Sequence, residues 1–328
     1  MNTVNKITSL KIGMIPYWNL LPFRHELSFN RGMSIELKTG HPTAVNKWLS
    51  EGAIHLAPSS SICLNMPGFE MSLPMGVASD GAVKSVFLGL HTEHLPLLPI
   101  LEEREKVVRD IFLQAQSSQQ FDARQVSQIA WEAVKSLPSF PITECPSIVL
   151  PPASASSVGL AKFLYNIWFG CEAYKFMAGR NFAKLYNDKK PIELVIGDEA
   201  LIKRPRFAKI LDLGEFWKDL TGLPFVYAVW QSKGLCLNGW RKKILEVGEL
   251  AEQKMHLDAS DYLPSLEPKD ESGNSISLSE YWKGIKYKLG PEEFRGLLAF
   301  LCLSRKISDR PLDHEIAVKL LRWQDLTL

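Results

Sequence analysis

The run Pro-Phe-Val-Tyr-Ala-Val-Trp at residues 224–230 is the stretch of sequence that decides the fold. Its aromatic and β-branched residues favour an extended strand, and its unbroken apolar character is typical of a strand buried on both faces. A second run of this kind, Val-Phe-Leu-Gly-Leu, lies far upstream at residues 86–90. We expect these two runs to be hinge strands, through which the chain leaves a first lobe and later returns to it.

Strands and helices alternate around these two runs, which predicts an α/β protein with parallel or mixed sheets. In such proteins a ligand binds in the crevice beyond the carboxyl ends of the strands, here the crevice between the lobes. The other expected strands are residues 10–15, 34–37, 54–57, 148–150 and 191–196. The expected helices include one between His41 and Gly52, one from Ser154 to about Phe169, and later ones that contain Ile244 and Phe294.

The expected domain organisation follows from the two hinge strands, where the chain passes from one lobe to the other. Residues 1–90 together with 226–328 form the first lobe, and residues 91–225 form the second lobe. Within the second lobe, residues 92–146 differ in character, because charged amphipathic stretches flank a polar linker. We expect this segment to be a helical hairpin or a partly mobile insertion in the lobe.

Composition excludes several classes of protein. The 328 residues carry a formal net charge of only +2, so no strong field points to nucleic acid or to a membrane surface. The five cysteines are widely spaced and include no Cys-x-x-Cys pair, as expected in a reducing compartment. No apolar stretch reaches the length of a membrane span, and the first residues lack the apolar core of a signal peptide. We therefore expect a cytoplasmic monomer or homodimer.

The sequence contains none of the common catalytic or nucleotide-binding signatures. The seven histidines are scattered, and no group of residues has metal-ligand spacing. We expect neither a metal nor a cofactor. The remaining candidates for a site are small polar residues that follow the expected strands.

These candidates have both structural and functional explanations. Tyr17 and Asn19 follow the first strand, where the asparagine amide offers neutral donors and an acceptor but is also common in turns. The serines after later strands can cap helices, and their amides and hydroxyls can also hold a carboxylate at a helix N-terminus. The other candidate residues are Ser59, Ser60, Ser79, Gly81, Lys84, Ser85, Ser154, Ser156, Ser157 and Asp198.

The order of these motifs resembles the menaquinone-biosynthesis family of the futalosine route. The most specific match is Trp-x-x-Leu-Thr-Gly-Leu-Pro-Phe-Val-Tyr-Ala-x-Trp at residues 217–230. A further match is Ile-Gly-x-Ile-Pro-Tyr-Trp-Asn-x-x-Pro at residues 12–22. The other matching segments are residues 79–86, 154–157, 196–201, 212–214 and 287–290. Residues 92–146 carry no matching motif and are longer than the connection usual in the family.

The resemblance implies a two-lobed periplasmic-binding-protein type II-like fold with two hinge strands and an interlobe cleft. Within the family, the pattern is similar to the branch that removes water from chorismate to give 3-[(1-carboxyvinyl)oxy]benzoate, a cofactor-free hydro-lyase reaction. The sister branch, a naphthoate synthase, uses a catalytic histidine in the second lobe, and residues 95–255 contain no histidine here. A small-carboxylate-binding protein without activity is the non-enzyme alternative.

The resemblance also assigns roles. Asn19 and Ser85 are the expected catalytic residues, with Asn19 near the reacting ring and Ser85 at one end of chorismate. The serines at positions 154, 156 and 157 are expected to hold a carboxylate. No matched residue is an evident strong base, so we expect the enolpyruvyl carboxylate of the substrate to take the ring proton, with Asp198 as the rival base.

Overall fold

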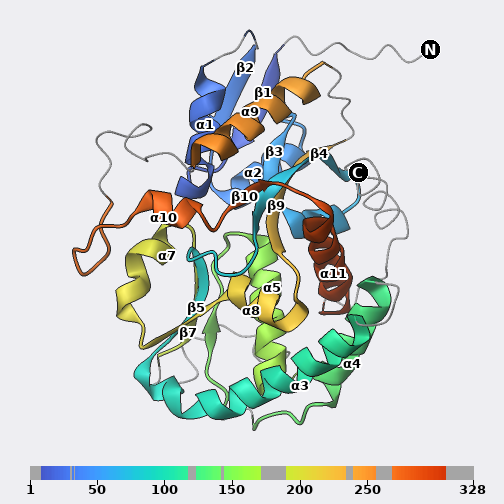
Figure 1. Cartoon of the computed structure of the whole chain (residues 1–328), viewed down its shortest axis with the longest axis vertical. Helices are drawn as coiled ribbons and strands as arrows, with labels where there is room; N and C mark the ends of the chain where they lie inside the picture. The colour runs from blue at the N-terminus through green and yellow to red at the C-terminus, as the bar shows by residue number, and fades with distance from the viewer. Residues whose placement is uncertain are drawn as a thin grey trace.

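The structure is a computed structural model, and it describes residues 9–29, 32, 34–116, 123–141, 144–170, 190–233, 239–255 and 268–307. Its strands form two four-stranded sheets and one two-stranded sheet (Figure 1). The four-stranded sheets have the orders β10-β4-β9-β3 and β6-β7-β5-β8. This two-lobed α/β architecture confirms the periplasmic-binding-protein-like fold that the sequence predicts.

The first lobe combines the β10-β4-β9-β3 sheet with the parallel pair β1-β2, and a bridge between Ile12 and Leu56 links the two. Its strands are β1 (Leu10–Met14), β2 (Ile35–Thr39), β3 (Ala57–Ser60), β4 (Phe69–Ser79), β9 (Phe225–Lys233) and β10 (Lys286–Lys288). Its helices are η1 (Trp18–Leu20), α1 (Leu21–Ser28), α2 (Pro42–Ser50), η2 (Ser61–Asn65), α9 (Arg241–Met255), α10 (Leu278–Trp282) and α11 (Pro291–Ile307).

The second lobe is built on the β6-β7-β5-β8 sheet, in which β5 pairs antiparallel with both β7 and β8. Its strands are β5 (Val86–Leu90), β6 (Ile148–Val149), β7 (Ile192–Ile196) and β8 (Lys209–Asp212). Its helices are η3 (Thr92–Leu97), α3 (Leu98–Gln116), α4 (Ala123–Ser136), α5 (Ala155–Phe169), α7 (Asp198–Lys203), η6 (Arg204–Arg206) and α8 (Leu213–Thr221).

Two short segments join the lobes. Residues 80–85 run from β4 to β5, and residues 222–224 run from α8 to β9. The expected grouping of residues 86–90 with the first lobe therefore differs from the sheet pairing, which places β5 in the second sheet. The strand belongs there because its neighbours β7 and β8 satisfy its backbone groups on both edges.

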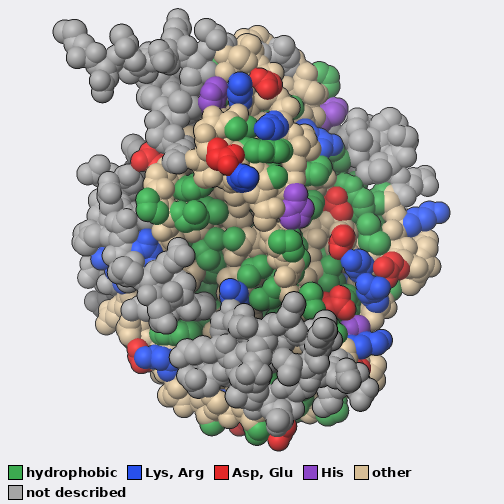
Figure 2. Space-filling view, turned by 180° about the vertical axis from the view of Figure 1, so that it is seen from behind, with side chains coloured by type: hydrophobic (Ala, Val, Ile, Leu, Met, Phe, Trp, Pro, Cys, Tyr) green, Lys and Arg blue, Asp and Glu red, His purple; other side chains and the backbone are tan. Residues whose placement is uncertain are grey.

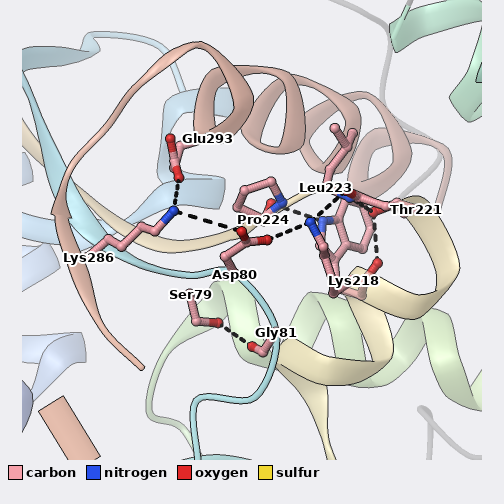
Figure 3. A network of polar contacts seen from close by, with 11 residues as sticks. Ser79, Asp80, Gly81, Lys218, Thr221, Leu223, Pro224, Lys286 and Glu293 are labelled. Carbon is pink, nitrogen blue, oxygen red and sulfur yellow. Dashed lines mark hydrogen bonds and ion pairs between the residues drawn. The ribbon is translucent and has the colours of Figure 1, made fainter. Parts of the chain in front are cut away.

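A chain of ion pairs includes Asp80, the first residue of the first crossing segment (Figure 3). Asp80 is 2.6 Å from the Lys218 ammonium on α8 and 3.9 Å from the Lys286 ammonium on β10. Lys286 lies 3.0 Å from the Glu293 carboxylate on α11. The pairs thus connect the last helix of the second lobe with the first lobe through the crossing segment.

The segment at residues 92–146 forms the helical hairpin that the sequence predicts, with α3 and α4 as its two arms (Figure 1). It is packed into the molecule. The buried Arg104 donates hydrogen bonds of 2.8 Å to the carbonyls of Ile167 and Pro138, and Ser127 on α4 donates to the carbonyl of Ala299 on α11. Since α11 lies in the first lobe, the hairpin is a second connection between the lobes.

Two strands differ from the sequence expectation. The strand expected at residues 54–57 is β3 at Ala57–Ser60, so Pro58 lies inside a strand. Proline is tolerated there because β3 is at the edge of its sheet. The long strand β4 was not expected, since Pro74 and Gly76 interrupt its apolar pattern, and its register with β9 shifts between Met71 and Gly76.

One apolar core runs through both lobes, with large buried side chains such as Trp230 in the first and Trp168 in the second. On the face seen in Figure 2, acidic and basic side chains are interspersed rather than gathered by sign. Among the described helices, none has the length and apolar character needed to cross a membrane.

Candidate functional site

A cavity lies between the two lobes, and it encloses about 570 Å³ of empty space including the part open to solvent. The ends of β1 and β7 and the start of α5 contribute to its wall, as expected for a crevice beyond strand ends. Its described lining residues include no Asp, Glu, His, Lys or Arg. The lining residues are Ile15, Tyr17, Asn19, Leu20, Pro42, Pro58, Ser60, Val77, Val83, Ser85, Val86, Ser154, Ser157, Ile196, Gly197, Tyr227 and Ala228.

Asn19 is placed in this wall by the short helix η1, which follows β1. Its side-chain oxygen Oδ1 is buried and has no hydrogen-bond partner among the described residues. A buried amide oxygen without a partner costs about 1–3 kcal/mol, so natural structures rarely leave one unless a ligand or water completes it. The backbone of Asn19 is held by a 2.5 Å hydrogen bond from the Tyr287 hydroxyl to its carbonyl oxygen.

Ser85 lines the cavity where the first crossing segment enters β5. Its carbonyl oxygen accepts from the Gly197 amide at 2.7 Å, and its side-chain oxygen accepts from the Tyr281 hydroxyl at 2.9 Å. Both bonds fix the residue, which is 1% exposed. The hydroxyl proton of Ser85 remains available to a group in the cavity.

The start of α5 forms another part of the wall. Ser154 caps the helix, and its side-chain oxygen accepts from the Ser157 amide at 3.3 Å. The two serine hydroxyls are 2.8 Å apart, so one of them donates to the other. The hydroxyl that accepts this bond keeps its own proton, which it can donate to a ligand. The N-terminus of a 15-residue helix also presents its partial positive charge here. This corner can hold a carboxylate without a cationic side chain.

Backbone strain is concentrated beside the cavity. Within the described ranges, Lys84 and Ser154 are the non-glycine residues with positive φ, at 67° and 30°. Each such backbone conformation lowers the stability of the folded state by about 1–3 kcal/mol and persists only where the surrounding structure holds it in place. Ser154 lines the cavity, and Lys84 directly precedes Ser85, so both strained positions set the direction of a site hydroxyl.

Asp212 is the main support of the first crossing segment, and the sequence analysis did not assign it a role. Its carboxylate accepts from the backbone amides of Val83 at 3.0 Å and Lys84 at 2.6 Å. It also caps α8 by accepting from Gly214 at 3.0 Å and Glu215 at 3.3 Å. One carboxylate therefore ties the strained segment before Ser85 to a helix of the second lobe.

Several expected binding residues hold the lobes together instead of lining the cavity. Ser156 on α5 is bonded to Ser61 at 2.9 Å and accepts from the Ile62 amide at 3.1 Å. Asp198 on α7 accepts from the Trp18 amide at 2.8 Å. Each bond joins the second lobe to the first. Ser60 does both, since it lines the cavity and accepts from the Ala155 amide at 3.2 Å.

The remaining candidates also lie outside the lining. Ser59 is buried and donates to Asn46 at 2.7 Å. Ser79 donates to the Gly81 carbonyl at 2.8 Å (Figure 3). The ammonium of Lys84 lies 3.4 Å from the Glu280 carbonyl, and Lys84 is not among the lining residues.

The tyrosines add a polar rim that the sequence analysis identified only in part. Tyr227, inside the hinge run, lines the cavity and lies 3.2 Å from the Ser79 hydroxyl. Burial raises the pKa of Tyr17, and the Asp198 carboxylate raises it further. Burial also raises the pKa of Asp198 to about 6, against the stabilising bond from the Trp18 amide. Both tyrosines are therefore neutral hydrogen-bonding groups at neutral pH.

Fold and site together define a two-lobed protein with a cavity between its lobes, whose described wall offers neutral hydrogen-bonding groups. The sequence profile of a family described as menaquinone biosynthesis matches residues 10–108 and 124–306. These ranges cover most of the chain, so the chain belongs to this family. The unmatched internal stretch is residues 109–123. Most of the hairpin expected to be an insertion therefore lies within the family's own pattern.

Solved structures with similarity to this chain include the following three. A gene product of Candida albicans, described as having the generic periplasmic binding protein fold, is 10% identical with a TM-score of 0.46, and the match covers 96% of this chain and 95% of that one. A ligand-binding component of an import system from Staphylococcus aureus is 11% identical with a TM-score of 0.46, over 94% and 96%. The aliphatic sulphonate binding protein of Escherichia coli is 12% identical with a TM-score of 0.43, over 98% and 87%.

Proposed function

We propose that this protein is a chorismate dehydratase, a cytoplasmic hydro-lyase that acts within menaquinone biosynthesis. Family membership supports a role in that pathway. The observation that carries the particular reaction is the chemistry of the cavity, whose described lining offers neutral donors and no ionisable base or acid other than tyrosine. A substrate that brings its own carboxylate base suits such a wall.

The proposed reaction needs little from the protein beyond orientation. The enolpyruvyl carboxylate of chorismate takes a ring proton, the electron pair of that C–H bond forms a ring double bond, and the C–O bond to the hydroxyl breaks. The leaving hydroxide takes the abstracted proton from the carboxylic acid group of the substrate and departs as water, and the ring becomes aromatic. Holding the reacting groups in contact and excluding water are the contributions that a closed cleft makes.

The donors are arranged on different sides of the cavity. Ser154 and Ser157 at the start of α5 are proposed to hold one carboxylate. Ser85 is proposed to bind the other end of the substrate. Asn19 is proposed to donate from its side-chain NH2 group to the departing hydroxyl or the ring region beside it, while its unpartnered Oδ1 accepts a bond from the ligand. Preorganised neutral donors of this kind stabilise developing charge without changing their own protonation.

The decisive experiment is incubation of the purified protein with chorismate, with detection of the aromatic product. We expect product without added metal or cofactor. Asn19→Ala and Ser85→Ala are each expected to lower kcat by about 100-fold or more, as removal of a single oxyanion donor does. Ser127→Ala removes a buried serine hydroxyl on α4, outside the lining, and is expected to retain activity. Near-normal turnover of chorismate by both cavity variants would refute the roles proposed for Asn19 and Ser85.

The alternatives give different results in the same assay. Tight binding of chorismate without product would indicate a small-carboxylate-binding protein. Turnover of a dehypoxanthine futalosine-type substrate, with chorismate unchanged, would indicate the sister synthase. The absence of histidine between residues 95 and 255 argues against that synthase, which uses a histidine of the second lobe.

A further inference from the structure

A segment near the end of the described chain supports both sides of the cavity. Residues 281, 282 and 287, in α10 and β10, each donate a side-chain hydrogen bond to a cavity-lining residue or to its direct neighbour in the chain, and their exposed fractions are 2%, 0% and 1%. The bonds run from Tyr281 to the Ser85 side chain at 2.9 Å, from Trp282 to the Trp18 carbonyl at 2.9 Å, and from Tyr287 to the Asn19 carbonyl at 2.5 Å.

The bond from Tyr281 differs from the other two, because it ends on a side chain that faces the ligand. The tyrosine hydroxyl is the donor and the Ser85 oxygen is the acceptor. A serine hydroxyl has one proton, so accepting this bond leaves that proton free. Among the described residues, the Ser85 side-chain oxygen has no other hydrogen-bond partner.

We propose that Tyr281 is a positioning residue that fixes Ser85 as a hydrogen-bond donor to the ligand. Without Tyr281, the Ser85 hydroxyl can rotate and its oxygen can act as an acceptor instead. Accepting a bond from the phenol also polarises the serine hydroxyl and strengthens the bond that it donates. The kinetic consequences rest on the function proposed above, whereas the hydrogen bond itself does not.

The surroundings of Tyr281 keep it a permanent donor. Burial raises the pKa of its phenol, and the nearby carboxylates of Asp198 and Asp212 raise it further. The phenol therefore stays protonated at any pH at which the protein works. Ser85 in turn is held through its backbone by the Gly197 amide, so the bond joins two fixed groups.

A double-mutant cycle tests the proposal through catalysis. Tyr281→Phe deletes only the hydroxyl, and we expect kcat for chorismate to fall about 10-fold, the equivalent of one hydrogen bond, with a smaller change in KM. In a Ser85→Ala background the same change is expected to have no further effect, because Tyr281 acts through Ser85. Tyr165→Phe, which deletes another buried phenol that bonds to the Pro146 carbonyl, is the matched control. Additive effects, or no effect of Tyr281→Phe, would overturn the proposal.

A second measurement does not depend on the reaction. In a Ser85→Cys variant the phenol donates to sulfur and stabilises the thiolate, so the thiol pKa is expected to rise by about one unit when Tyr281→Phe is added. The pH dependence of alkylation by iodoacetamide reports this pKa, with the parent protein and Tyr281→Phe alone as backgrounds. Identical profiles in the two cysteine variants would overturn the proposal.

The two measurements separate the two hypotheses. If the parent protein leaves chorismate unchanged, the proposed function fails, and the cysteine titration still decides whether Tyr281 donates to position 85. If the parent protein forms product while both tests show no link between the two residues, the proposed function stands and the role of Tyr281 is refuted.

Discussion

Replacement of Asp212 by alanine is expected to cost more stability than any surface change in this protein. The carboxylate is 6% exposed and accepts four backbone N–H groups from two segments. Loss of the cap of α8 costs about 1 kcal/mol, and the bonds to Val83 and Lys84, each made to a charged acceptor, are worth about 1.5 kcal/mol or more apiece. The expected loss in the free energy of unfolding is therefore about 4 kcal/mol.

Urea unfolding followed by tryptophan fluorescence measures this loss as a lower midpoint with an unchanged slope. The matched control is Asp80→Ala, in the crossing segment that Asp212 supports. The Asp80 carboxylate is 39% exposed and forms exposed ion pairs, so its removal should cost at most about 1 kcal/mol. A loss below about 1 kcal/mol for Asp212→Ala would refute the view that this carboxylate holds the strained segment before Ser85.

Two further predictions concern charge and space at the site. Asp198 has a pKa raised by burial from 3.8 to about 6, so the folded protein loses stability as pH rises from about 4 to about 6. Asp198→Asn should abolish this loss of stability, which amounts to at most about 3 kcal/mol at neutral pH. Urea titrations of the wild-type protein and the variant at several pH values measure the loss. A wild-type protein that gains stability relative to the variant over this pH range would contradict the prediction. Gly214→Ala should lower both stability and turnover, because the added Cβ would lie 2.4 Å from the Gly81 carbonyl and 2.5 Å from the Tyr227 hydroxyl. Calorimetry and the chorismate assay check this, and unchanged values in both would contradict it.

The sequence predicted the parts of the fold that depend on local pattern. Continuous apolar runs identified β5 and β9, and the amphipathic stretches identified both arms of the α3–α4 hairpin. It did not predict β4, because Pro74 and Gly76 conceal a strand that the neighbouring β9 and β10 stabilise. Pairing between distant segments decides that strand, and a single sequence carries little information about such pairing.

In the candidate site, too, local sequence pattern predicts some residues, whereas contacts between distant segments decide others. Asn19, which follows the first strand, and Ser85, which directly precedes β5, were predicted as candidates because polar residues at strand ends border the crevice between the lobes. The sequence did not predict the supporting roles of Asp212 and Tyr281. Asp212 lies 128 positions from Lys84, whose amide it accepts, and Tyr281 lies 196 positions from Ser85, to which it donates. A tyrosine within a short amphipathic helix carries no local sign of the hydroxyl to which it will donate.

The position of the α10–β10 segment has a consequence for how the protein is made. Chain synthesis completes the second lobe before the first, yet the groups at residues 18, 19 and 85, in or beside the cavity wall, are held by residues 281–287. A ribosome-bound chain that ends before α10 has most of the described strands but lacks these three donors. The cavity is therefore completed only after α10 and β10 have been synthesised, and the elements made before them fold without these three bonds.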